Sequence, residues 1–240
     1  MIEIQHVSKR YGSSARKAVA DLSFTVRPGE ICGFLGHNGA GKTTTIKMIV
    51  GLLKPDEGTV KVAGHDVQRE PLLAKQSLAF VPDTPEIYPQ LTGLEYLNFI
   101  GDIYGVPAAQ RQARISRFAE EFELTGALTD RINAYSHGMQ QKIVLMGALL
   151  HNPPVWVLDE PMVGLDPRSA HILKELMAEH TKAGNTVLFS THVLEVAEKL
   201  CDRVAIMKEG QIVAQGAVAD LRAERGGESL ESIFLGMTAR

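Results

Sequence analysis

The chain is poor in cysteine and lacks the residue spacings of a zinc site. Its 240 residues include two cysteines, Cys32 and Cys201, which stand far apart in the sequence. No closely spaced cysteine and histidine ligands accompany them, so the pattern disfavours structural zinc. Two isolated thiols are typical of buried, reduced side chains in a cytoplasmic protein.

Long apolar runs are also missing. No uncharged stretch approaches the ~20 residues that cross a bilayer. The longest candidate, residues 143–150, suits a buried helix. The start of the chain has no apolar segment of the kind found in secretory signals. On this pattern the chain is expected to be neither a channel nor a carrier in its own right.

Charge of one sign does not dominate the composition either. The formal net charge is −3 at pH 7, whereas proteins that bind nucleic acid usually carry a basic patch or a high isoelectric point. The sequence therefore disfavours a nucleic-acid partner. A hydrophobic fraction of 45% and a charged fraction of 22% are ordinary for a globular protein and exclude a disordered, collagen-like or coiled-coil chain.

Strand and helix patterns alternate along most of the chain. Short branched runs predict strands at residues 2–6, 22–26, 31–35, 59–62, 78–81, 155–158, 186–190, 204–207 and 211–213. Helical periodicity marks residues 42–53, 169–183, 193–200 and 218–234. This alternation predicts an α/β fold with a parallel sheet. Residues 91–150 have a helical pattern alone, so we expect an inserted helical subdomain at about 84–152 within a single domain, 1–240.

A glycine-rich motif lies between the predicted strand 31–35 and the helix that follows. It reads Gly36, His37, Asn38, Gly39, Ala40, Gly41, Lys42 and Thr43, with Thr44 next. In such a loop backbone N–H groups surround phosphate oxygens, and the helix N-terminus adds its positive dipole. Lys42 would lie against the β- and γ-phosphates, and Thr43 would offer a hydroxyl to Mg²⁺. The motif predicts a nucleoside triphosphate site.

Two acids end the apolar strand 155–158. Acids at the carboxyl end of a parallel strand lie at the edge where α/β sheets bind ligands. Asp159 would hold Mg²⁺, directly or through water, and Glu160 would polarise an attacking water as a general base. A solvated turn explains these acids equally well when they are taken alone. The phosphate loop favours the functional interpretation.

Further segments make the chain resemble the ABC-type ATPases over essentially its whole length. Ser136, His137, Gly138 and Met139 are similar to the family's signature, usually LSGGQ. Residues 164–166 resemble its D-loop, which ends here in Asp166, and His192 follows a strand as the family's switch histidine does. Tyr11 lies where the family has an aromatic that stacks on adenine. The motifs keep the family's order along the chain.

The resemblance implies an architecture and a reaction. The fold would be a P-loop NTPase core of the RecA type, with an N-terminal antiparallel β subdomain and an inserted α-helical subdomain. The activity would be ATP hydrolysis with Mg²⁺, carried by Lys42, Glu160 and His192. The signature residues would contact ATP bound by a second ATPase chain, and Asp166 would couple the two sites.

Some positions depart from the family pattern. Asp83 stands where the family has its Q-loop glutamine, and a carboxylate can ligate Mg²⁺ but cannot donate as an amide does. We expect Asp83 to keep a metal-sensing role. In the signature, His137 and Met139 replace a glycine and a glutamine, while Ser136 and Gly138 are retained.

The resemblance also implies partners. A chain without a membrane span would act on an integral membrane permease, held beside residues 83–97, from the inner face of the cell membrane. The second ATPase chain could be identical or different. The tail 229–235 is similar to that of bacterial exporter ATPases. The alternative is a soluble ABC ATPase acting on the ribosome or DNA. Glu160 and His192 argue against a subunit that binds ATP without hydrolysing it.

Overall fold

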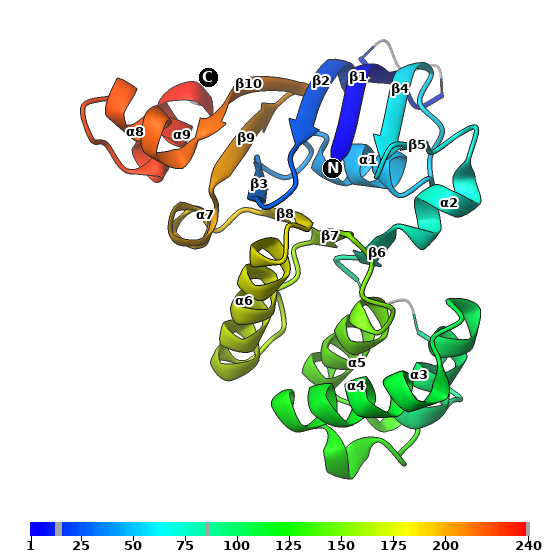
Figure 1. Ribbon diagram of the computed structural model, residues 1–240. Helices are drawn as coiled ribbons and strands as arrows, with labels where there is room; N and C mark the ends of the chain where they lie inside the picture. The colour runs from blue at the N-terminus through cyan, green and yellow to red at the C-terminus, as the bar shows by residue number, and fades with distance from the viewer. Residues whose placement is uncertain (13–15, 85–86, 239–240) are drawn as a thin grey trace.

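The protein folds into two β-sheets with helices between and below them (Figure 1). The computed structural model describes residues 1–12, 16–84 and 87–238. One sheet is antiparallel, in the order β2-β1-β4-β5. Its strands are β1 (Ile2–Lys9), β2 (Val19–Val26), β4 (Glu57–Val62) and β5 (His65–Asp66). The predicted antiparallel β subdomain at the start of the chain is confirmed.

The second sheet has the order β10-β9-β3-β8-β7-β6. All neighbours in it are parallel except the β9–β10 hairpin at one edge. Its strands are β3 (Ile31–Leu35), β6 (Leu78–Val81), β7 (Val155–Asp159), β8 (Thr186–Thr191), β9 (Arg203–Lys208) and β10 (Gln211–Ala217). Every residue of β3, β7 and β8 is buried, as expected for parallel strands covered on both faces. The predicted α/β core is confirmed.

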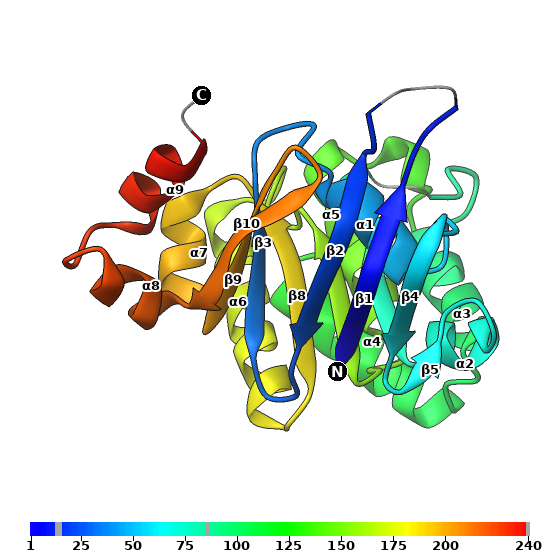
Figure 2. The ribbon, with the colours of Figure 1, turned by 90° about the horizontal axis from the view of Figure 1, so that it is seen from above.

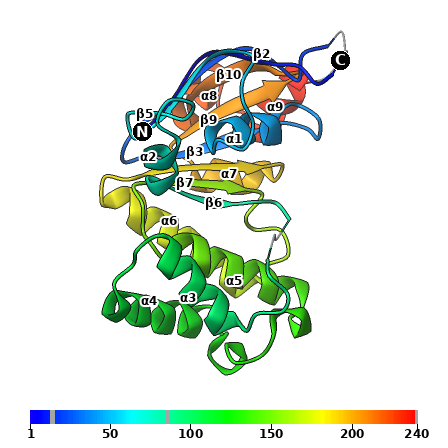
Figure 3. The ribbon, with the colours of Figure 1, turned by 90° about the vertical axis from the view of Figure 1, so that its right-hand side faces the viewer.

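Helix α1 (Lys42–Ile49) lies between the two sheets (Figure 3). Its buried residues Ile46, Met48 and Ile49 join a core made by the antiparallel sheet and one face of the parallel sheet. Apolar burial of this kind stabilises by about 25 cal/mol per Å². This core packs α1 against the parallel sheet, and the N-terminus of α1 lies at the carboxyl end of β3.

The remaining helices cover the other face and one edge of the parallel sheet. Below it lie α3 (Gly93–Ile103), α4 (Ala108–Glu121), α5 (His137–Leu149) and α6 (Pro167–Lys182). At the other end, α7 (Leu194–Leu200), α8 (Val218–Glu224) and α9 (Leu230–Thr238) lie close together (Figure 2). Helix α2 (Pro71–Gln76) and two short 3-10 turns, Thr125–Ala127 and Ile132–Ala134, complete the elements.

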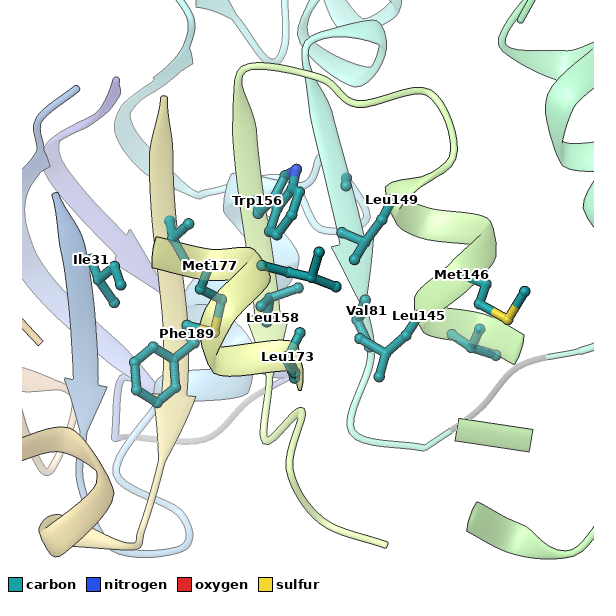
Figure 4. Close-up of a cluster of buried hydrophobic side chains, with 14 of the residues drawn as sticks. Ile31, Val81, Leu145, Met146, Leu149, Trp156, Leu158, Leu173, Met177 and Phe189 are labelled. Carbon is teal, nitrogen blue, oxygen red and sulfur yellow. The ribbon is translucent and has the colours of Figure 1, made fainter. Parts of the chain in front are cut away.

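Alternate residues of the parallel strands point into this lower core. Figure 4 shows Leu158 and Trp156 of β7 among side chains of α5 and α6, including Leu149 and Met177. Their neighbours along the strand, such as Val157, enter the upper core instead. Because successive side chains of a strand point to opposite faces, each parallel strand contributes to both the lower and the upper core.

Three expectations about helices need correction. The helix expected at 42–53 ends at Ile49, because Gly51 adopts a left-handed conformation (φ 71°) that stops it. The tail expected as one helix at 218–234 is two, separated at Gly226 and Gly227, whose φ angles are 69° and 88°. Residues 71–76, for which the apolar pattern predicted no helix, form α2 after β4 and β5.

Among the described residues, no helix has the length and apolar character required to span a membrane.

Candidate functional site

The phosphate loop follows β3 and ends where α1 begins at Lys42. Glycine is required at Gly36, where a Cβ would lie 2.7 Å from the Met207 carbonyl oxygen and 2.9 Å from Ala40 Cβ. It is also required at Gly41, whose φ is 108°. The Ala40 N–H donates to the His37 carbonyl at 3.1 Å, which closes the turn. The loop is thus a tight backbone ring against the end of β9.

Lys42 places its ammonium inside this ring. Its Nζ donates to the Gly36 carbonyl at 2.5 Å and also lies 3.4 Å from the His37 carbonyl oxygen. Burial lowers the pKa of Lys42, while the charges of Glu160 and Asp159 oppose that shift. A buried cation at the loop is the electrostatic feature that an anionic phosphate requires.

Asp159 is the last residue of β7, which β8 separates from β3 in the sheet. Its side chain is buried and lines the same cavity as the phosphate loop. Ser190 Oγ donates to its Oδ1 at 2.5 Å. Burial raises the pKa of Asp159, and hydrogen bonds from the Ser190 and Thr43 hydroxyls oppose the shift. The charged form of a buried carboxylate is stabilised by a nearby cation. Ser190, which the sequence placed only within a strand-end segment, orients this carboxylate.

Glu160 and His192 contact each other next to Asp159. The Nδ1 of His192 lies 3.0 Å from Oε1 of Glu160. Glu160 has a left-handed backbone (φ 48°), and its N–H donates to Ser190 Oγ at 3.0 Å. Strained backbone at a non-glycine residue costs about 1–3 kcal/mol and clusters at functional sites. The geometry holds the Glu160 carboxylate at the sheet edge with one oxygen on a histidine.

One open cavity of about 230 Å³ collects the predicted phosphate and metal residues. Its lining includes Lys42, Thr43, Asp83, Asp159 and Glu160, together with His37, Asn38, Gly39, Gly41 and Thr44. Asp83 is exposed in the segment after β6, and its charge reaches Asp159. The sequence therefore predicted side chains that the fold does bring together.

The oxygen donors in this cavity fit Mg²⁺. Thr43 and Asp159 are hydrogen-bonded, and Asp83 adds a second carboxylate to the lining. In the described part of the chain no group of three or more acidic, histidine or cysteine side chains forms a metal cage. That is consistent with Mg²⁺, which usually takes one or two protein oxygens and completes its shell with water and substrate phosphates.

Tyr11 lies beside a second cavity, of about 260 Å³, that shares Gly39 and Ala18 with the first. Its side chain is exposed, and its hydroxyl is 3.4 Å from Thr44 Oγ1. Lys17 and Glu209 also line this cavity. A flat ring next to the phosphate loop can hold a base while the first cavity holds its phosphates.

The signature residues lie elsewhere. Ser136 caps helix α5, its hydroxyl accepting the Met139 N–H at 3.3 Å. A Cβ on Gly164 would lie 2.7 Å from His137 Cδ2, and one on Gly138 would lie 2.9 Å from the Gly164 carbonyl oxygen. The signature thus packs against residues 164–166. Within the described chain, the lining of the phosphate cavity includes none of residues 136–139.

Asp166 caps helix α6 and is bound on two sides. Its carboxylate accepts from the Ser169 N–H at 2.9 Å and from the Ser169 hydroxyl at 2.8 Å. The ammonium of Lys142, on α5, is 2.7 Å from the same carboxylate. These bonds hold the pKa of Asp166 well below its usual range. Lys142 was not predicted as a site residue, because nothing local in the sequence marks a partner 24 positions away.

Comparison with known proteins gives one consistent family. The family model described as "ABC transporter" matches residues 19–163. The linearmycin resistance ATP-binding protein LnrL of Bacillus subtilis is 37% identical over 96% of this chain and 73% of its own length. The Nod factor export ATP-binding protein I of Paraburkholderia xenovorans is 38% identical over 97% of this chain and 76% of its own. The structure of an ATP-binding subunit of an ABC transporter superposes with a TM-score of 0.94 at 35% identity, covering 99% of both chains.

Proposed function

We propose that this chain, which belongs to the ABC transporter family and is an ATP-binding ATPase subunit, powers export through a membrane permease. It would do so as one of two ATPase chains that bind ATP between them. The main support for this proposal is that the signature residues lie apart from the phosphate cavity of the same chain. Lys42 and Glu160 line the phosphate cavity, whereas Ser136 stands outside it. A second chain would supply the missing signature contact.

The chemistry of one site follows from the residues that line the cavity. Lys42 would exchange its bonds with the loop carbonyls for phosphate oxygens, because an anion is the stronger acceptor. Glu160 would take a proton from the attacking water, and His192 Nδ1 holds one of its oxygens at 3.0 Å. His192 Nε2 is then left to meet the γ-phosphate.

Thr43, Asp159 and Asp83 are the proposed metal residues. Mg²⁺, when bound, supplies positive charge against the β- and γ-phosphates. Thr43 and Asp159 would hold it from the loop and the sheet edge. Asp83 would reach it through water from the segment that follows β6, and the substitution Asp83→Ala tests this. Unchanged Mg²⁺ dependence of hydrolysis would remove Asp83 from the set.

Dimerisation would join the signature of one chain to the ATP of the other. The N-terminus of α5 offers the Ser136 hydroxyl and N–H groups as an anion site. Residues 164–166 touch this N-terminus and would meet the opposing chain, so Asp166 would couple the two sites. Loss of the γ-phosphate would then allow the halves to separate, which converts hydrolysis into movement.

The permease is proposed to bind beside the helical subdomain, residues 84–152. Tyr88 and Phe99 are exposed there, with their rings edge to face at 5.5 Å, and Ile103 continues the apolar surface. Residues 85–86 of the predicted docking segment 83–97 lie outside the described residues. Exposed aromatic side chains that contact one another are typical of protein interfaces. The chain would therefore sit on the inner face of the cell membrane.

Export is favoured by the relatives and by the tail. One relative is named for Nod factor export and another for linearmycin resistance. Residues 229–235 carry the exporter-like sequence, and they form the start of α9. The alternative, a soluble ATPase on the ribosome or DNA, is disfavoured by the net charge of −3.

Copurification with Glu160→Gln tests the proposal. This variant keeps the shape of the side chain but removes the base, so ATP should hold the assembly together. The tagged variant is isolated from detergent-solubilised cells with MgATP, and wild type with ADP is the control. We expect a polytopic membrane protein in stoichiometric amount. Ribosomal or DNA-bound partners would overturn the transporter function in favour of the alternative.

A further inference from the structure

Helix α9 reaches the phosphate loop from the opposite end of the sequence. The ring of Phe234 packs against the ring of His37, with centroids 4.8 Å apart and planes at 63°. Phe234 is 5% exposed, and Leu230 and Ile233 of the same helix are also buried. Edge-to-face ring pairs add stabilisation beyond that of buried area. The contact therefore joins a core-anchored helix to a residue of the loop.

Helix α9 is held at both ends. At its start, the Leu230 N–H donates to Glu198 Oε2 at 2.8 Å, and Arg222 pairs with the other oxygen of Glu198 at 3.2 Å. At its far end, Lys208 Nζ donates to the Met237 carbonyl at 3.4 Å. Glu198 belongs to α7, the helix that follows His192. Lys208 ends β9, the strand that packs against Gly36 through Met207.

His37 forms the turn of the loop. Its carbonyl accepts the Ala40 N–H at 3.1 Å and lies 3.4 Å from Lys42 Nζ. Its side chain points from that turn to Phe234. Fixing the ring of His37 therefore restricts the backbone that presents N–H groups to phosphate and contacts the Lys42 ammonium.

We propose that Phe234 is a positioning residue for ATP binding, and that α9 is a brace which holds the phosphate loop in its binding shape. The brace acts through His37 and does not touch the reacting atoms. Pre-organisation of the loop reduces the ordering cost of binding, so loss of the contact should weaken ATP binding. This inference goes beyond the proposed export function and depends only on ATP binding at the loop.

A double-mutant cycle measures the coupling directly. The full-length variants are Phe234→Leu, which keeps apolar volume without the ring, His37→Ala, and both together. Equilibrium binding of a fluorescent ATP analogue and steady-state hydrolysis give affinity, KM and kcat. We expect each single change to weaken binding about two- to tenfold, the range of one aromatic pair. The double variant should bind ATP no more weakly than the weaker-binding of the two single variants. Phe234→Leu, which lies outside the phosphate cavity, should leave kcat at saturating ATP unchanged.

Two further variants keep the test decisive. Phe234→Tyr retains the ring on α9 and should restore most of the ATP affinity that Phe234→Leu loses, which a loss of packing volume alone would not explain. Leu235→Ala alters the exposed neighbour on α9 and should leave affinity unchanged. Thermal melts verify that each variant is folded. The proposal is overturned if the effects of the two single changes multiply in the double variant, or if Phe234→Leu and Phe234→Tyr bind ATP equally well.

Discussion

The ammonium of Lys142 lies 2.7 Å from the carboxylate of Asp166, so the signature helix α5 and the cap of α6 are joined by an ion pair within one chain. Asp166 also accepts two hydrogen bonds from Ser169, and its side chain remains 45% exposed. The pair fixes residues 164–166 beside the signature. In the proposed dimer, any movement of α5 that ATP causes in one site would thus reach the loop that we propose faces the other site.

The first prediction concerns acid stability. Because the pKa of Asp166 is lowered in the folded protein, its contribution to stability is fully present above the unfolded value of about 4. It is lost progressively as the pH falls from there through the much lower folded pKa. Lys142→Met should reduce stability at pH 7 by about 1 kcal/mol or less, since the pair is partly exposed. The difference in melting temperature between variant and wild type should be constant from pH 7 to about pH 5 and should narrow, without vanishing, as the pH is lowered to 3.

Lys199→Met is the matched control for that series. Lys199 pairs with Glu195 at 2.7 Å, but both side chains are about three-quarters exposed. Its removal should leave the melting curve close to that of wild type at every pH. An equal loss for Lys142→Met and Lys199→Met would contradict a special contribution from the buried end of the Lys142 pair.

The second prediction separates stability from activity at Asp159. Burial raises the pKa of this carboxyl, so charging it destabilises the free protein as the pH rises through the unfolded value toward the folded one. Asp159→Asn removes that charge and keeps an oxygen for the Ser190 hydroxyl. We expect the melting temperature at pH 7 without nucleotide to rise by about 2–4 °C, as about 1 kcal/mol produces in a chain of this length.

The same variant should lose Mg²⁺-dependent hydrolysis by at least about 100-fold, since the removed charge is the one proposed to hold the metal beside the phosphates. Calorimetry and a phosphate-release assay on one preparation measure both effects. A variant that is less stable than wild type and equally active would refute the assignment of Asp159.

The third prediction tests the backbone of the loop. Gly36→Ala introduces a Cβ 2.7 Å from the Met207 carbonyl oxygen. This oxygen belongs to the backbone of β9, so it cannot move away without disturbing the strand. ATP affinity should fall by about tenfold or more, the result of about 1.4 kcal/mol of lost binding. Gly126→Ala, where a Cβ meets nothing within 4 Å, is the control. Equal affinities for the two variants would show that the loop relaxes at no cost.

The fourth prediction tests the ring beside the phosphate loop. Stacking of a base on an aromatic side chain contributes about 1–3 kcal/mol. Tyr11→Ala should therefore weaken ATP binding by about five- to 100-fold, whereas Tyr11→Phe retains the ring and should bind normally. Triphosphate without a base should bind both variants equally. A strong effect of Tyr11→Phe would assign the contribution to the hydroxyl near Thr44 instead.

Local patterns predicted the parts of the fold and site that lie close together in the sequence. The apolar runs identified the parallel strands because a sheet covered on both faces buries nearly every strand residue, and polar residues such as Asp159 stand at the strand ends. The phosphate loop was recognisable because its glycines are required by backbone geometry, as the approach of Gly36 to Met207 illustrates. Asp159 and Glu160, at the end of the apolar strand 155–158, then indicated that the site lies at the carboxyl edge of the parallel sheet.

Contacts between distant residues were not predictable from these patterns. Ser190 reaches Asp159 across 31 positions, and Phe234 reaches His37 from the other end of the chain. Lys142 looks like an ordinary helix residue until its partner is known. The two-glycine break after α8 was missed because the apolar spacing continues beyond it. Tertiary packing, which propensity does not encode, decides the long-range contacts. The break after α8 is a local turn at two glycines in the left-handed region.

The central claim, that two chains bind ATP between them, is tested most directly by the mass of Glu160→Gln in solution. Light scattering is measured with ADP, with MgATP, and with MgATP after the further change Ser136→Arg, which should block the signature. We expect one-chain mass with ADP, twice that mass with MgATP, and one-chain mass again for the double variant. A single-chain mass at saturating MgATP, or a dimer that Ser136→Arg leaves intact, would contradict it.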